Sequence, residues 1–340
     1  MKKNLLLTLL LLGLASYLTY QASKPASVNK VTPVQSVKKE KAPKPSLPKL
    51  DLVVTSPGLL DNTTIEIIST SLDSPLSYSQ KSKEIEKLRN KDLQKDDFLA
   101  LYNFLKTKPS LAGAQLALHS LKNDILVFVI NDGRYKELTA LLMLDIINDP
   151  YQHEVMREYT LQYTTDYFQR HWLDTKAGRP MEKSSLSLID KELQTSFLTT
   201  MWNMVGENNG SIAGTSLTRL NDLSENFSIV DSQRIIEESA YIVKDLQAPV
   251  SLRMSALSIA TKRKLKHLKK DIHEIVLNEE NAISLRMAAL HTASTMNDQD
   301  GFIENITHNF IDNDNVDSRL QVASKMILKQ LNKNDRDKTK

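Results

Sequence analysis

The residues that could carry metal or acid–base chemistry are thinly spread along this sequence. Its seven histidines include no His-Glu-x-x-His motif and no pair four residues apart. His267 and His273, followed by Glu274, come closest to a metal-binding set, but on a helix two residues six positions apart point to different faces. Cysteine is absent, which excludes thiolate metal sites and a cysteine nucleophile. The sequence therefore predicts no metal site, no cofactor and no catalytic residue.

One stretch, residues 151–222, keeps an unrecognised enzyme open as an alternative. It offers the acid–base groups His153, Glu154, Asp166 and His171, which are scattered rather than set at a catalytic spacing. Such an enzyme would need a concave pocket in which these side chains converge.

A second alternative rests on charge. The 44 Lys and Arg residues nearly balance the 41 Asp and Glu residues, so any charge effect must be local. Six cations fall within nine residues: Lys262, Arg263, Lys264, Lys266, Lys269 and Lys270. Such a cluster can bind an anionic membrane surface or another polyanion. It equally fits an exposed turn whose lysines follow the carboxyl end of a helix.

Aromatic residues form the predicted contact surface for a partner protein. Tyr159, Tyr163 and Tyr167 share one helix face through their spacing of four residues, and Trp172 follows them. Aromatic side chains that carry a polar group are common anchors in protein interfaces. The alternative is a packed seam between helices, because a repeat core also needs large side chains.

An export signal precedes the domain that would position these residues. Lys2 and Lys3 come before a long apolar run, which is the order typical of an export signal. Counted over residues 4–22, the run is long enough to span a membrane, and no well-placed small-x-small cleavage site follows it. We therefore expect residues 1–23 to be a signal anchor in the inner or plasma membrane, with the rest of the chain periplasmic or extracellular. The alternative is a cleaved signal peptide and a secreted protein. In either case nucleic acid is not an expected partner.

Residues 24–80 are predicted to be a disordered or weakly structured linker. Its first part, residues 24–50, holds five prolines and seven lysines without a glycine or an aromatic residue. Such a composition cannot bury enough apolar surface to offset the entropy lost on ordering the chain.

From about residue 81 the apolar residues have helical spacing, as in the stripe Phe98, Leu101, Tyr102 and Leu105. Segments rich in Asp, Asn, Gly or Pro interrupt this pattern near residues 132–133, 149–150, 178–180, 208–210, 248–249, 278–281 and 313–315. Short helices between regular breaks favour an all-α repeat protein.

An internal repeat is clear in the last third of the chain. The sequence VSLRMSAL at residues 250–257 matches ISLRMAAL at residues 283–290, a shift of 33 residues. Another 33 residues on comes VDSRLQVA, so an arginine recurs at Arg253, Arg286 and Arg319. A cation in the first turn of a helix opposes the helix dipole and needs a compensating partner. We therefore predict a structural ladder of arginine–carboxylate or arginine–carbonyl contacts from one repeat to the next.

The order of an apolar residue, arginine, alanine and leucine, as at Val250, Arg253, Ala256 and Leu257, resembles the inner helix of the HEAT-repeat (ARM-like) family. The resemblance covers residues 232–332, and residues 81–231 look like diverged copies, for example around Arg157. It implies a right-handed superhelix of helix pairs, an α-solenoid, that is used mainly to bind proteins. Residues 333–340 are expected to be a charged tail.

The first interpretation is therefore an extracytoplasmic protein-interaction or scaffold module without catalytic activity of its own. Its expected partners are another protein, and the membrane through residues 4–22.

Overall fold

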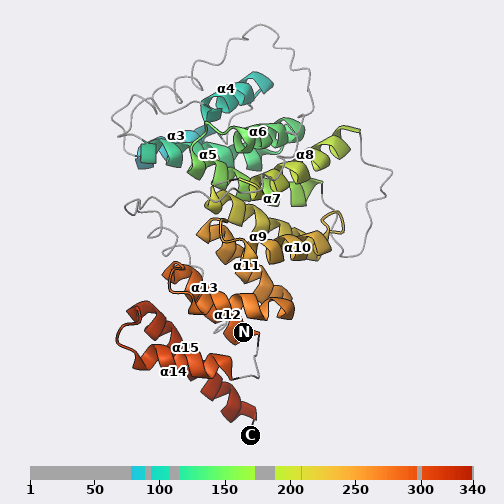
Figure 1. Cartoon of the computed structure of the whole chain (residues 1–340). Coiled ribbons are helices and arrows are strands. Elements are labelled where there is room, and N and C mark those ends of the chain that lie inside the picture. Colours follow the sequence, from blue (N-terminus) through green and yellow to red (C-terminus); the bar gives the residue numbers. More distant parts are fainter. Residues whose placement is uncertain are drawn as a thin grey trace. The chain divides into compact units, whose positions relative to one another are not determined.

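The computed structural model describes residues 78–88, 93–106, 115–172, 188–207, 209–296 and 301–338. Within these residues the fold is all-α and contains no strand (Figure 1). The predicted signal anchor and the predicted linker up to residue 77 lie outside the described residues. Among the helices that the structure describes, none is both long enough and apolar enough to cross a membrane.

The chain divides into two compact units, and the division falls within α10 (Ser232–Lys244), between Ile235 and Ile236. The first unit contains α3 (Tyr78–Leu88), α4 (Lys95–Lys106), α5 (Gln115–Asp132), α6 (Lys136–Asn148), α7 (Glu154–His171), α8 (Leu188–Val205) and α9 (Gly210–Asn226). The second contains most of α10, then α11 (Val250–Arg263), a short 3-10 helix, η2 (Lys266–Leu268), α12 (Lys269–Leu277), α13 (Ile283–Thr295), α14 (Phe302–Asp312) and α15 (Ser318–Lys338).

The element bounds depart from the predicted domain limits at two places. Helix α3 begins at Tyr78, so it includes the last residues of the predicted linker. Helix α15 continues to Lys338, so most of the predicted charged tail is helical.

The helices of the first unit pack in pairs. Helix α6 lies on α7 and α8 lies on α9, while the second helices α5, α7 and α9 form a row, each in contact with the next (Figure 1). Helix α6 also contacts α8, so neighbouring pairs touch through their first helices as well. The apolar side chains on each side of a helix pair are therefore buried against the neighbouring pairs.

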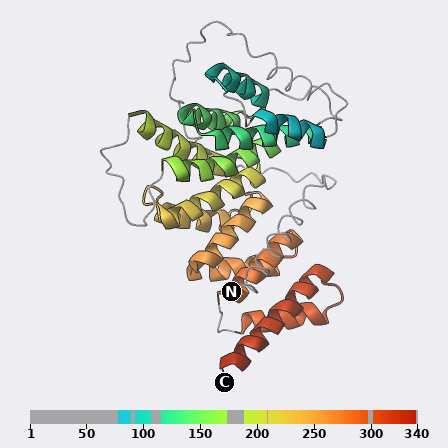
Figure 2. The same ribbon diagram turned by 180° about the vertical axis from the view of Figure 1, so that it is seen from behind.

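The second unit repeats this pairing. Helix α12 packs on α13 and α14 on α15, and α11, α13 and α15 form a row of second helices (Figure 2). Its core comes from the repeated sequence itself: Leu252, Ala256, Leu257 and Ala260 are buried in α11, as are Leu285, Ala289, Leu290 and Ala293 in α13. The alanines let neighbouring helices approach closely while the leucines fill the space between them.

Helix ends fall at the predicted breaks that the structure describes. Helices α5, α6, α12 and α14 end at Asp132, Asn148, Leu277 and Asp312, and α9 and α11 begin at Gly210 and Val250. After α5 the chain turns through Gly133, whose φ of +72° lies in the left-handed region that glycine adopts without strain. The predicted break at residues 178–180 lies outside the described residues.

Candidate functional site

A basic side chain on the second helix of a pair donates a hydrogen bond to the end of the first helix. The four bonds are Lys122 Nζ to the Leu105 carbonyl (2.9 Å), Arg157 Nε to Ile147 (2.8 Å), Arg253 Nη2 to Val243 (3.0 Å) and Arg286 Nε to Val276 (3.0 Å). In every case the accepting carbonyl belongs to the last residue but one of the preceding helix. All four side chains are buried.

For Arg157, Arg253 and Arg286 this bond explains why a cation stands in the first turn of a helix. The last four carbonyls of a helix have no partner within it, and the carboxyl end of the helix carries partial negative charge. A buried cation from the next helix satisfies both needs. The predicted arginine–carbonyl contacts therefore exist for Arg253 and Arg286, but these bonds join the two helices of one pair rather than neighbouring repeats.

Arg319 does not belong to this set, contrary to the predicted ladder. It is exposed and pairs with Asp317 at the start of its own helix, with Nη2 and Oδ2 2.8 Å apart. In α15 the buried residues Leu320, Ser324 and Ile327 repeat the spacing of Leu285, Ala289 and Thr292 with a shift of 35 residues. Gln321 thus occupies the arginine position, and its Nε2 donates to the Asn313 carbonyl at 2.9 Å.

The three buried arginines differ in what else they contact. Arg157 also reaches the following helix pair, where its Nη2 lies 3.3 Å from Sδ of Met204 and 3.3 Å from Oε1 of Glu207. The guanidinium of Arg286 lies over the ring of Phe310 from α14, 5.5 Å from its centroid. In both cases a side chain from the next pair covers the guanidinium.

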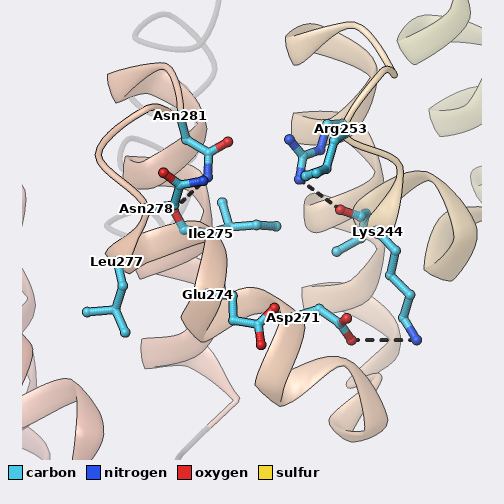
Figure 3. A pocket seen from close by; sticks show the side chains of 10 residues that line it. Lys244, Arg253, Asp271, Glu274, Ile275, Leu277, Asn278 and Asn281 are labelled. Carbon is cyan, nitrogen blue, oxygen red and sulfur yellow. Dashed lines mark hydrogen bonds and ion pairs between the residues drawn. The ribbon is translucent and has the colours of Figure 1, made fainter. Parts of the chain in front are cut away.

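Arg253 instead lines an open pocket of about 450 Å³ within the second unit (Figure 3). One wall comes from the end of α10, the turn after it and the start of α11; the opposite wall is α12 and the turn that follows it. Figure 3 shows the guanidinium of Arg253 facing Ile275 and Asn281 across this space.

The guanidinium of Arg253 is poorly satisfied for a buried charge. The side chain is only 4% exposed, its one side-chain hydrogen bond runs to Val243, and its buried Nε has no partner. Burial lowers the pKa of Arg253, and the nearby charge of Asp245 offsets part of that effect. Because arginine stays protonated in proteins, the pocket holds a fixed positive charge with unused donors.

The remaining lining combines paired charges with exposed apolar groups. Lys244 Nζ lies 3.6 Å from Asp271 Oδ2, and Glu274 Oε1 lies 3.8 Å from Lys270 Nζ. Leu246 and Leu277 line the pocket while 72% and 51% exposed, a large exposed fraction for leucine. The pocket can therefore receive both an anionic group and an aliphatic one.

The predicted aromatic surface does not exist as one surface. Tyr159 is 44% exposed and Tyr163 is half-buried, but Tyr167 is fully buried and Trp172 is 3% exposed. The indole of Trp172 donates to Asp190 at 2.7 Å and its ring packs 4.9 Å from that of Phe168. Tyr167 and Trp172 thus form the packed seam that was the alternative, while residues 173–187 beside them lie outside the described residues.

Trp172→Ala is therefore expected to act on stability rather than on binding. Removing this buried ring should lower the free energy of unfolding by about 3–5 kcal/mol, since it leaves a cavity between α7 and α8. Tyr159→Ser, on the exposed side of the same helix, should change it by less than about 0.5 kcal/mol. Urea unfolding followed by circular dichroism measures both, and equal effects of the two substitutions would contradict the buried placement.

The basic cluster lies on the connection between α11 and α12. Lys264 takes the left-handed conformation that ends α11, with φ of 53°, and the neighbouring Leu265 and Leu268 are buried. Lys262, Lys264, Lys266 and Lys270 are exposed, whereas Arg263 and Lys269 are half-buried. The arrangement is a cationic turn held in place by two leucines.

The acid–base residues between 151 and 222 do not converge. His153 accepts the Val155 amide proton at the start of α7, Glu154 accepts from Asn209 at 2.6 Å, and Asp166 lies 3.7 Å from Arg219. His171 packs its ring on Tyr167. No group of three or more metal-ligating side chains gathers anywhere in the part of the chain that the structure describes.

Comparison of the chain with known protein families, curated proteins and solved structures finds no match.

Proposed function

We propose that the chain is a protein-binding module without catalytic activity of its own, built as a HEAT-like α-solenoid. The repeated helix pairs support this architecture, as do the rows α5–α7–α9 and α11–α13–α15 and the basic side chain that caps the first helix of most pairs. Stacked pairs of this kind present long surfaces suited to binding other proteins.

The proposal places the module outside the cytoplasm, held by a signal anchor over residues 4–22 and spaced from the membrane by the linker over residues 24–80. The apolar run after Lys2 and Lys3 supports this location, as does the proline- and lysine-rich composition that follows.

The observation that carries the proposal is the open pocket at Arg253. Two exposed leucines, Leu246 and Leu277, flank a buried guanidinium that has an unused donor. A fixed charge surrounded by apolar side chains is typical of sites that bind a polypeptide segment. One side chain of the segment pairs with the charge, and the residues next to it contact the apolar groups.

Site-specific photo-crosslinking of the full-length protein in its native cells tests this function. A photoreactive residue in place of Leu277 should capture one and the same protein reproducibly, and Leu246→Asp should abolish the capture. The matched control carries the photoreactive residue at Met326, which is 58% exposed on α15 of the same unit. Capture of no protein from position 277, or of the same mixture from both positions, would reject the proposal.

A second candidate function is binding of an anionic membrane surface through the cationic turn. The exposed side chains of Lys264, Lys266 and Lys270 favour it. It predicts that the protein binds vesicles containing phosphatidylserine, that binding falls with salt, and that replacing these three lysines by glutamine removes it. Binding unaffected by salt or by the substitutions would exclude it.

A further inference from the structure

The first unit shows what fills the position beside a capping arginine. The Nη2 of Arg157 lies 3.3 Å from the carboxylate of Glu207, which stands two residues after the end of α8 in the following helix pair. The cap on the carbonyl of Ile147 leaves the guanidinium with spare donors, and a carboxylate takes up one of them. Arg157 thus caps a helix and binds a carboxylate at the same time.

In the described part of the chain, no carboxylate contacts Arg253 in the way that Glu207 contacts Arg157. Glu279 stands two residues after the end of α12, as Glu207 does after α8, but it is exposed and does not line the pocket. Arg286 has no such vacancy, because Phe310 covers its guanidinium. Among the three buried arginines that the structure describes, Arg253 alone combines a buried unpartnered donor with an open pocket.

We infer that this pocket binds a carboxylate side chain of a partner polypeptide at Arg253, with an aliphatic side chain of the same segment against Leu246 and Leu277. The inference deepens the proposed function and rests on it, because it names the chemistry by which the partner is recognised. A carboxylate matches the fork of donors on a guanidinium, and burial strengthens the pairing.

The other charged groups of the pocket select against more highly charged anions. Asp271 and Glu274 balance Lys244 and Arg253, so the lining carries no net charge. A phosphate dianion would meet repulsion from both acids, whereas one carboxylate beside an aliphatic group needs only the spare donors of Arg253. An acidic residue next to a leucine or isoleucine is the smallest ligand that fits these requirements.

The test uses the full-length chain labelled with ¹⁵N-arginine and follows the Nε–H resonance of Arg253 by NMR. The probes are acetyl-Leu-Glu-Leu-amide, its glutamine analogue, sodium acetate and inorganic phosphate. We expect the glutamate peptide to shift this resonance at millimolar concentration, and the other three probes to bind at least about tenfold more weakly.

Arg253→Lys is the informative variant, because Lys122 shows that a buried lysine can cap the end of the first helix of a pair, although it does so from further along its own helix. It should keep the fold and lose at least about tenfold in affinity for the glutamate peptide. The matched control is Arg286→Lys, at an arginine that Phe310 covers and that does not line the pocket, and it should bind the peptide as the wild type does. Equal binding of the glutamate and glutamine peptides, or equal binding by Arg253→Lys and wild type, would overturn the inference. Crosslinking at position 277 without this peptide selectivity would leave the proposed function standing and overturn only the carboxylate.

Discussion

Arg286→Ala is expected to lower the free energy of unfolding by about 3 kcal/mol, although the side chain lies in the first turn of a helix, where a cation is ordinarily unfavourable. The substitution removes the bond to the Val276 carbonyl and the packing on Phe310, and it leaves the end of α12 with a buried carbonyl that has lost its donor. Urea unfolding followed by far-ultraviolet circular dichroism measures the loss.

Arg319→Ala provides the control within the same sequence repeat. Its guanidinium is exposed and its pair with Asp317 lies at the surface, so the expected loss is no more than about 0.5 kcal/mol. The amide of Arg319 keeps its hydrogen bond to Asp317 in this variant, which preserves the start of α15. A similar loss for both substitutions would show that the period of 33 residues, and not the observed capping bond, identifies the important arginines.

The second large effect is expected at Lys122, whose burial lowers its pKa from an ordinary 10.5 to about 8. Between these two pH values the unfolded chain binds more protons than the folded one, so this group makes stability rise with pH. Relative to Lys122→Met, wild type should gain about 2.5 kcal/mol of unfolding free energy between pH 7 and pH 10. Parallel urea titrations across this range measure the difference.

Comparison of the two proteins isolates Lys122 from other groups that titrate at alkaline pH. Tyr167 contributes to both proteins alike, since burial raises its pKa to about 12. His119, whose ring lies 4.1 Å from that of His153, is neutral throughout the range, because burial lowers its pKa. A stability difference that stays constant from pH 7 to pH 10 would show that burial does not lower the pKa of Lys122.

The capping bond and the pocket are two consequences of one arrangement. A cation that caps a neighbouring helix must be buried, and a buried guanidinium has more donors than a single carbonyl can accept. At Arg157 and Arg286 the following helix pair covers the rest of the guanidinium. At Arg253 it does not, and a donor of the guanidinium remains free to bind a ligand. A binding site can thus arise from a capping contact that most pairs share.

The sequence by itself determined the helical class and the positions of many turns, although the turns between α9 and α10 and between α11 and α12 were not among the predicted breaks. Apolar residues spaced three and four apart over more than ten residues form one face only on an α-helix. Asp, Asn, Gly and Pro favour turn conformations of the backbone, and they therefore mark where helices end. The repeat of Arg253 at Arg286 also specified the same capping bond for both, because the buried residues around them recur with it.

Only the tertiary structure decided which of the tyrosines and arginines are buried, and which of the buried arginines remain open to a ligand. Spacing placed Tyr159 and Tyr167 on one face, but the packing of α7 left the first exposed and buried the second. The sequence period assigned Arg319 to the ladder, whereas a shift of two residues in α15 gave its place to Gln321. The pocket at Arg253 depends on how far side chains from the next helix pair reach, a long-range property that no local pattern records.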